Sequence, residues 1–226
     1  MSTINFSGVS HAFGERQVLR GIDLSLTEHR IGIVGANGSG KSTLARMING
    51  LVAPSSGTVT VDGLDAVKKA REVRRKVGFI FTNPDNQIVM PTVQEDIAFT
   101  LRRRGLSTAE IAERTVAALE RFGLAGHAEH PAHLLSGGQK QLLALAAVLV
   151  AEPQVLVADE PTTLLDARNA RHIGELLRSM TQQVIVVTHQ FGLLEGFDRV
   201  IVIEHGEVVA DGFPEDSLDS YRALLA

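Results

Sequence analysis

A glycine-rich segment has residue types and a spacing that suit phosphate binding. It reads Gly35-Ala36-Asn37-Gly38-Ser39-Gly40-Lys41-Ser42-Thr43. Glycines let the backbone fold tightly, so that consecutive N–H groups point at one phosphate. Lys41 would reach the β- and γ-phosphates, and the Ser42 hydroxyl would bind Mg²⁺. The alternative is an ordinary glycine-rich turn. A β-branched run before the segment and a helical pattern after it favour the phosphate loop, because this motif needs a strand before it and a helix after it.

Two adjacent carboxylates follow an apolar run farther along the chain. Asp159 and Glu160 come directly after Val155-Leu156-Val157-Ala158. A strand there would place Asp159 at the carboxyl edge of a sheet, where open α/β sheets bind ligands. Asp159 could hold Mg²⁺, and Glu160 could accept a proton from an attacking water. An acidic loop is the alternative, and the phosphate loop in the same chain favours the catalytic reading.

A second helix start has features of an anion site. The segment Leu135-Ser136-Gly137-Gly138-Gln139 contains the S-x-x-Q form of a capping box, and its two glycines expose the backbone. Taken alone, the segment would be interpreted as an ordinary helix cap.

The elements that must position these residues alternate between strands and helices. Short β-branched runs occur at 30–34, 58–61, 77–81, 155–158, 184–187 and 200–203. Several of them are apolar throughout, which indicates strands buried on both faces, as in a parallel sheet covered by helices. The first sixty residues and the segment 207–211 have glycine turns that predict antiparallel additions. The fold class is therefore α/β, with a mostly parallel sheet and an N-terminal antiparallel β addition.

Helical patterns replace strand patterns between residues 82 and 150. Ser107-Thr108-Ala109-Glu110 reads as a capping box that opens a helix to about Phe122, and Gly123 stops it. A second helix is predicted from about Gly137 to Ala151. We predict one domain over residues 1–226, with an α/β core at 1–81 and 151–226 and an inserted helical subdomain at 82–150.

The composition limits the function classes. The longest apolar run, Leu142 to Ala151, is too short to span a bilayer, which needs roughly 20 apolar residues. The first residues have no pattern of a secretory signal, and the absence of cysteine fits a reducing compartment. A net charge of −4 and 4% aromatic residues argue against nucleic-acid binding. Basic runs at 71–76 and 102–104 are expected to be solvated faces of helices.

Together, the three motifs resemble the ATP-binding-cassette (ABC) ATPases over nearly the whole chain. Residues 135–139 match that family's signature motif without departure. The resemblance implies a phosphate-loop nucleoside triphosphatase fold, ATP and Mg²⁺ as ligands, and ATP hydrolysis. It implies that Gly35 to Thr43 and Ser136 to Gln139 contact the nucleotide, that Ser42 and Asp159 hold the metal, and that Glu160 is the catalytic base.

Other marks of the family fall in the expected order. Gln87 matches the glutamine that touches Mg²⁺ and the attacking water, and His189 matches the switch histidine that senses the γ-phosphate. Asp166 matches the aspartate of the loop at the dimer interface. Phe13 corresponds to the aromatic residue under the adenine, where Tyr is more common. Leu164 departs from the small residue that the family commonly has there, and should alter packing across the dimer.

The resemblance also implies partners. Two subunits face each other head to tail, so that ATP lies between the phosphate loop of one protomer and Ser136 to Gly138 of the other. The dimer could be a homodimer or a heterodimer with a paralogous ATPase. The segment Phe81 to Phe99 resembles the energy-coupling-factor subgroup, which imports vitamins and transition-metal ions. We therefore expect an importer of biotin, or else of cobalt or nickel, with the chain bound through integral membrane subunits to the cytoplasmic face of the inner membrane.

Two other functions fit the sequence less well. A soluble ABC ATPase acting on nucleic acid or ribosomes would carry a long coiled coil or a second cassette, and neither pattern is present. A kinase or small GTPase would not need the signature motif. The histidines at 127, 130 and 133 are spaced three apart, but surface or structural roles are expected for them rather than metal binding. The apolar stretch from Ile88 to Val93 would either dock a helix of a membrane partner or pack locally in the core.

Overall fold

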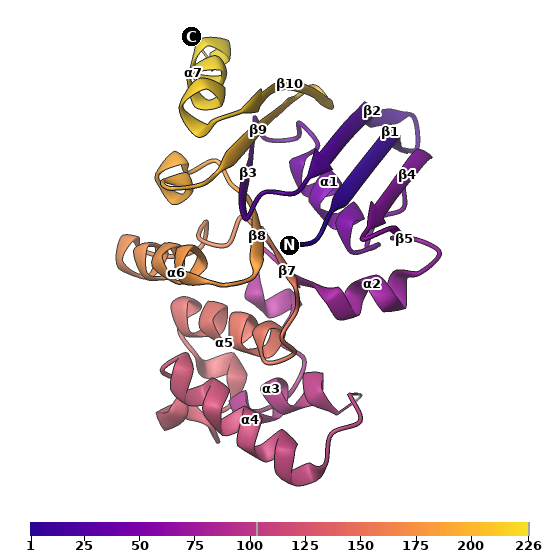
Figure 1. The fold of residues 1–226 in the computed structure, drawn as a ribbon. Coiled ribbons are helices and arrows are strands. Elements are labelled where there is room, and N and C mark those ends of the chain that lie inside the picture. The colour runs from indigo at the N-terminus through magenta and orange to yellow at the C-terminus, as the bar shows by residue number, and fades with distance from the viewer. Residues whose placement is uncertain (103, 226) are drawn as a thin grey trace. The chain divides into compact units, whose positions relative to one another are not determined.

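The fold was obtained as a computed structural model that describes residues 1–102 and 104–225. It divides into two compact units (Figure 1). The α/β unit comprises residues 1–79, 154–160 and 177–226, and the helical unit comprises 80–153 and 161–176. The predicted division assigned 151–226 entirely to the α/β core. The structure instead groups 161–176 with the helical residues, where Asn169 lies against Gly138.

One sheet of the α/β unit is antiparallel, as predicted for its N-terminal region. Its order is β2-β1-β4-β5, and the strand bounds are β1 Ile4–Phe13, β2 Arg16–Leu26, β4 Ser56–Val61 and β5 Leu64–Asp65. β1 pairs antiparallel with β2 and β4. β1 and β2 are longer than the short strands expected from sequence. The register of their pairing shifts at three places along β1.

The second sheet leads to Glu160 and His189, two of the three predicted catalytic residues, which follow β7 and β8. Its order is β10-β9-β3-β8-β7-β6, with β10 Glu207–Gly212, β9 Arg199–Glu204, β3 Arg30–Val34, β8 Gln183–Val187, β7 Val155–Asp159 and β6 Val77–Ile80. Every residue of β3, β7 and β8 is buried. β9, β3, β8 and β7 run parallel to one another, and β10 runs antiparallel to β9. The prediction of a mostly parallel sheet buried on both faces is confirmed.

Three helices belong to the α/β unit: α1 Lys41–Ile48, α2 Ala70–Lys76 and α7 Pro214–Leu225. α1 contacts strands of both sheets, namely β2 and β4 of the first and β7 and β8 of the second. It buries Leu44, Met47 and Ile48 completely. α7 packs on β9 and β10 (Figure 1).

The helical unit consists of α-helices joined through short 3₁₀ segments. Its elements are η1 Pro84–Asn86, α3 Val93–Leu101, α4 Thr108–Arg121, η2 Ala125–His127, η3 Ala132–Leu134 and α5 Gly137–Leu149. α6, Ala167–Ser179, runs from this unit into the α/β unit. α3 packs against α4 and α5.

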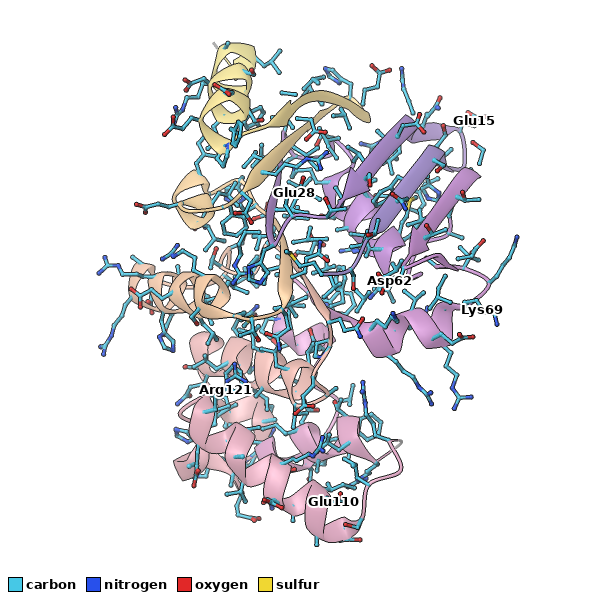
Figure 2. The ribbon with its side chains drawn as sticks, viewed as in Figure 1. Glu15, Glu28, Asp62, Lys69, Glu110 and Arg121 are labelled. Carbon is cyan, nitrogen blue, oxygen red and sulfur yellow. The ribbon has the colours of Figure 1, made fainter. Side chains whose placement is uncertain are left out.

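Capping boxes define where the helices of this unit begin. Ser107 accepts the N–H of Glu110, and the Glu110 carboxylate accepts the N–H of Ser107 at the start of α4. Glu110 is labelled in Figure 2. This capping box confirms the predicted start of α4, and Phe122 and Gly123 end it as predicted. The basic run at 102–104 was predicted on a helix, but α3 ends at Leu101 and Arg102 is its C-cap; Arg103 lies outside the described residues.

A search of the described residues finds no helix that is both long and apolar enough to cross a membrane.

Candidate functional site

The glycine-rich segment joins the end of β3 to the start of α1, as its sequence predicts. Gly35 has a φ of 148°, and a Cβ there would lie 1.9 Å from the backbone oxygen of Ile203. Gly40 has a φ of 108°, and a Cβ there would lie 2.8 Å from the backbone oxygen of Val18. Only glycine fits both positions. The loop backbone therefore packs closely against the backbone of Ile203 and Val18.

Lys41 occupies a buried place inside this loop. Its side chain folds back, and Nζ donates to the backbone oxygen of Ala36 at 2.8 Å. Burial lowers the pKa of Lys41, and the carboxylates of Glu160, Asp159 and Glu204 act against this shift. A bound phosphate would add negative charge near the ammonium and favour its charged form. Lys41 is thus placed as an anion-binding group.

Asp159 ends β7 and is completely buried. Its Oδ1 accepts from the Ser42 hydroxyl at 2.6 Å, and its Oδ2 accepts from the guanidinium of Arg46 at 3.1 Å. The structure therefore brings together Ser42 and Asp159, the two residues predicted to hold Mg²⁺. Arg46 was not predicted. It lies one helical turn after Ser42, so the spacing of the two on α1 was a usable signal.

Glu160 follows with a backbone conformation that is uncommon for a residue other than glycine. Its φ is 52°, and its N–H donates to the backbone oxygen of Val187 at 2.9 Å. This left-handed conformation separates the direction of the Glu160 side chain from that of Asp159. Glu160 Oε2 lies 2.9 Å from Nδ1 of His189, which follows β8. The predicted catalytic base and the predicted switch residue thus contact each other directly.

A cleft of about 340 Å³ opens beside the glycine loop. Residues of the loop, of α1 and of the first hairpin line it, together with Glu160; the full set is Phe13, Arg16, Val18, Asn37, Gly38, Gly40, Lys41, Ser42, Thr43 and Glu160. Phe13 is 57% exposed, and its ring makes a T-shaped contact with the His11 ring, with ring centroids 4.5 Å apart. An exposed ring at the mouth of the cleft can stack on a purine base, as predicted for Phe13.

Arg16 is a second cleft residue that the sequence did not single out. It pairs with Phe13 across the β1–β2 hairpin. A Cβ built on Gly38 would lie 3.4 Å from Nη2 of Arg16, so the guanidinium lies over the phosphate loop. Arginine is suited to contact a phosphate. The Gly14-Glu15 turn in the sequence predicts the hairpin, but only the folded chain shows where Arg16 points.

The chemistry of these residues fits a magnesium nucleotide. The Ser39 hydroxyl is buried in the loop and has no hydrogen-bond partner among the described residues, as expected of a group that awaits a ligand. Ser42 and Asp159 supply the oxygen atoms that Mg²⁺ prefers, while phosphate oxygens and water would fill its other positions. No group of three or more acidic, histidine or cysteine side chains that could hold a metal alone occurs among the described residues.

The predicted signature residues begin α5 in the helical unit. The Ser136 hydroxyl accepts the N–H of Gln139, and Oε1 of Gln139 accepts the N–H of Ser136 at 2.9 Å. This capping box confirms the helix start inferred from sequence. The N–H groups of Gly137 and Gly138 lie in the first turn, where a helix favours an anion.

Asp166 and Gly138 are linked through one residue of α6. Asp166 accepts the backbone N–H of Asn169 at 2.9 Å and its side-chain amide at 2.8 Å. The first of these bonds lowers the pKa of Asp166. A Cβ on Gly138 would lie 2.6 Å from the Asn169 side chain. The interface loop is thus joined to the signature helix within one unit, and Leu164 of this loop is 59% exposed.

Gln87 belongs to the helical unit. It caps η1, its Oε1 accepts the N–H of Phe81 at 3.2 Å, and its Nε2 donates to the backbone oxygen of Ala144 at 3.4 Å. Its role as a metal ligand stays a prediction.

His127 supports the signature helix, a role that the spacing of the histidines did not indicate. Nε2 of Gln139 is 2.9 Å from Nε2 of His127, and Nδ1 of His127 is 2.8 Å from Nδ1 of His130. Because an amide nitrogen only donates, His127 accepts from Gln139 and donates to His130. This is a structural role, as expected for these histidines.

The strand, glycine loop and helix, with two carboxylates at the end of β7 in the same parallel sheet, define a phosphate-loop nucleoside triphosphatase. The family model described as ABC transporter matches residues 19–163. The chain belongs to the ABC transporter family of ATP-binding proteins.

Relatives and a solved structure agree with this assignment. The chain is 44% identical to the biotin transport ATP-binding protein BioM of Rhizobium etli, over 99% of each chain. It is 42% identical to the energy-coupling factor transporter ATP-binding protein EcfA1 of Symbiobacterium thermophilum, over 96% of this chain and 82% of that one. The structure of cbiO1 from Clostridium perfringens, part of the ABC transporter complex cbiONQ, superposes with a TM-score of 0.84 at 31% identity, covering 98% of this chain and 92% of that one.

Proposed function

We propose that the chain is the ATP-hydrolysing subunit of an energy-coupling-factor importer, with biotin as the first substrate to test and cobalt or nickel as the second. One observation carries the ATPase assignment. Ser42, Asp159, Glu160 and His189 meet at the carboxyl edge of one sheet, beside the cleft that Phe13 and the glycine loop line. The similarity to the biotin and energy-coupling-factor ATP-binding proteins supports the choice of transporter.

ATP binds in this cleft with its base on Phe13 and its phosphates on the glycine loop. Lys41 and Arg16 face the phosphates, while Ser42 and Asp159 would hold Mg²⁺, which would supply positive charge to the phosphates. Glu160 accepts a proton from the water that attacks the γ-phosphorus, and the bond from that phosphorus to the β-phosphate oxygen breaks.

His189 links the base to the γ-phosphate. The ring holds Glu160 through Nδ1, and 50% of its side-chain surface is exposed. When the ring carries both protons, Nε2 can donate to a phosphate oxygen while Nδ1 donates to the carboxylate. Arrival of the γ-phosphate would therefore change the hydrogen bonding of the residue that orients Glu160.

Closure of a dimer completes the site. The N–H groups of Gly137 and Gly138 in one protomer bind the γ-phosphate held by the glycine loop of the other. Hydrolysis removes this shared anion and weakens the contact. Either two copies of this chain or one copy with a paralogue would satisfy the arrangement.

The chain would reach the membrane through its transporter subunits. Within the helical unit, Val89 is 64% exposed and Phe99 is 44% exposed, whereas Val93 is buried. The apolar stretch therefore divides into a core part and an exposed part. The exposed part is the docking surface for an integral membrane partner.

The test is uptake in the source organism after deletion of the gene. Radiolabelled biotin, cobalt and nickel would be supplied in separate assays, and the deletion would be complemented with the wild type or with Glu160→Gln. We expect biotin uptake to fall at least tenfold in the deletion and to return only with the wild type. Loss of cobalt or nickel uptake instead would change the substrate, and unchanged uptake of all three would refute the importer assignment.

A further inference from the structure

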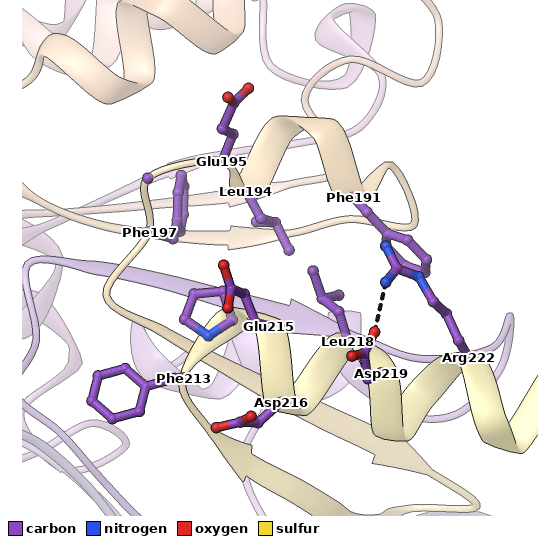
Figure 3. A pocket seen from close by; sticks show the side chains of 12 residues that line it. Phe191, Leu194, Glu195, Phe197, Phe213, Glu215, Asp216, Leu218, Asp219 and Arg222 are labelled. Carbon is purple, nitrogen blue, oxygen red and sulfur yellow. Dashed lines mark hydrogen bonds and ion pairs between the residues drawn. The ribbon is translucent and has the colours of Figure 1, made fainter.

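A cavity of about 750 Å³ lies away from the nucleotide cleft, between η4, Phe191–Leu194, and α7. No residue that we place in ATP binding or hydrolysis lines it. Its volume lies in the range of sites that bind small ligands or the side chains of a peptide. Figure 3 shows Leu218 pointing from α7 toward Leu194 of η4.

The walls of this cavity are apolar. Leu194, Phe197 and Leu218 face it, and Leu194 and Phe197 are buried in the core of the α/β unit. Phe213, at its edge, is 75% exposed. The exposed ring continues the apolar wall of the cavity out to the solvent, and a continuous apolar surface suits contact with a partner.

The edge of the same cavity is acidic. It carries the carboxylates of Glu195, Glu215, Asp216 and Asp219, and one cation, Arg222. Arg222 is already paired with Asp219 at 2.7 Å and lies over the Phe191 ring (Figure 3). Glu195, Glu215 and Asp216 form no ion pair within the described chain. The cavity therefore offers three uncompensated negative charges around an apolar floor.

We infer that this cavity docks a basic segment of a partner polypeptide, in which a large apolar side chain stands beside lysine or arginine. The apolar side chain enters between Leu194 and Leu218, and the cations meet Glu195, Glu215 and Asp216. The charge of the edge selects against nucleic acid and acidic lipid, because both would bring negative charge to it. η4 begins two residues after His189. The partner segment would therefore bind to the 3₁₀ helix that follows the predicted switch residue.

The inference is tested by fluorescence anisotropy with a labelled ten-residue peptide that has a central Leu-Phe pair flanked by lysine and arginine. A control peptide carries glutamate at every basic position. We expect the basic peptide to bind at least tenfold more tightly than the acidic one, and its affinity to fall in high salt, because exposed charges are screened. No binding of the basic peptide, or equal binding of both peptides, would overturn the inference.

Variants locate the bound peptide on the surface. Phe213→Ala should weaken binding about fivefold or more, whereas Val116→Ala, at another exposed apolar residue on α4, should not. The combined change Glu195→Gln, Glu215→Gln and Asp216→Asn should weaken binding about tenfold. The matched change Glu113→Gln and Glu120→Gln on α4 should leave it within twofold. Equal losses in the cavity variants and their controls would mean that the peptide binds elsewhere. The assay contains no nucleotide, so its outcome is independent of the proposed transport function.

Discussion

At the scale of single residues, the pairing of Glu160 with His189 would connect proton transfer to recognition of the γ-phosphate in the proposed mechanism. Asp159 is held by Ser42 and Arg46, while Glu160 turns away from it through a left-handed backbone. Two adjacent carboxylates can therefore serve different purposes. In the proposed mechanism, the first holds the metal and the second accepts a proton from the attacking water.

Glu160→Gln should separate binding from hydrolysis. The amide keeps the shape of the side chain but cannot accept the proton of water, so we expect turnover to fall by at least about 100-fold. ATP binding should persist, and the dimer should stay closed with ATP. Phosphate release and size-exclusion chromatography with MgATP would measure the two effects. Lys41→Ala is the contrasting variant, because it should weaken nucleotide binding itself; normal turnover in Glu160→Gln would remove this residue from its assigned role.

At the scale of elements, two capping boxes of the same chemistry begin α4 and α5. Ser107 and Ser136 each accept the N–H of the third helical residue. Replacing such a serine with alanine typically costs about 1 kcal/mol of stability. The two helices differ in function, since only the start of α5 is proposed to meet ATP.

Ser107→Ala and Ser136→Ala should therefore lower the free energy of unfolding by similar amounts but differ in activity. We expect ATPase activity to stay within twofold for Ser107→Ala and to fall at least tenfold for Ser136→Ala. Urea denaturation and phosphate release would measure both. If the two variants lost activity equally, the signature segment would act only as a helix cap.

Asp96 is a buried carboxylate that fixes the loop before α3. Its Oδ1 accepts the N–H groups of Val89 and Met90 at 2.8 and 3.0 Å. Burial raises the pKa of Asp96 in spite of these two bonds. The ionised form is therefore less favourable in the folded than in the unfolded chain, and this cost is relieved as the pH falls.

Asp96→Asn should stabilise the protein at neutral pH, because the amide oxygen can accept the same two N–H groups without carrying charge. The gain over the wild type should shrink as the pH falls through the raised folded-state pKa toward the ordinary aspartate range near about 4. Urea denaturation at several pH values would follow it. A gain that grows on acidification would contradict the assigned direction of the shift.

At the scale of the whole molecule, the sequence predicts best what depends on local pattern. The glycine spacing from Gly35 to Gly40 predicts the phosphate loop, and the apolar runs within β3, β7 and β8 predict buried strands. Arg46 and His127 escaped prediction as site residues because their roles depend on partners from other elements, Asp159 and Gln139. The grouping of 161–176 with the helical unit depends likewise on the contact between Gly138 and Asn169.

Transport by the whole assembly should depend on an exposed apolar surface that hydrolysis does not need. Val89→Asp places a charge on a residue that is 64% exposed, so the fold should tolerate it, but a buried contact with a membrane partner should not. We expect basal ATPase activity within twofold of the wild type and biotin uptake reduced at least tenfold. Val116→Asp, at a residue 54% exposed on α4, is the matched control and should transport normally. Because both variants add one carboxylate to an exposed valine of the helical unit, a loss of uptake in Val89→Asp alone assigns docking to its loop. Undiminished uptake in that variant would mean that the membrane partner binds another surface.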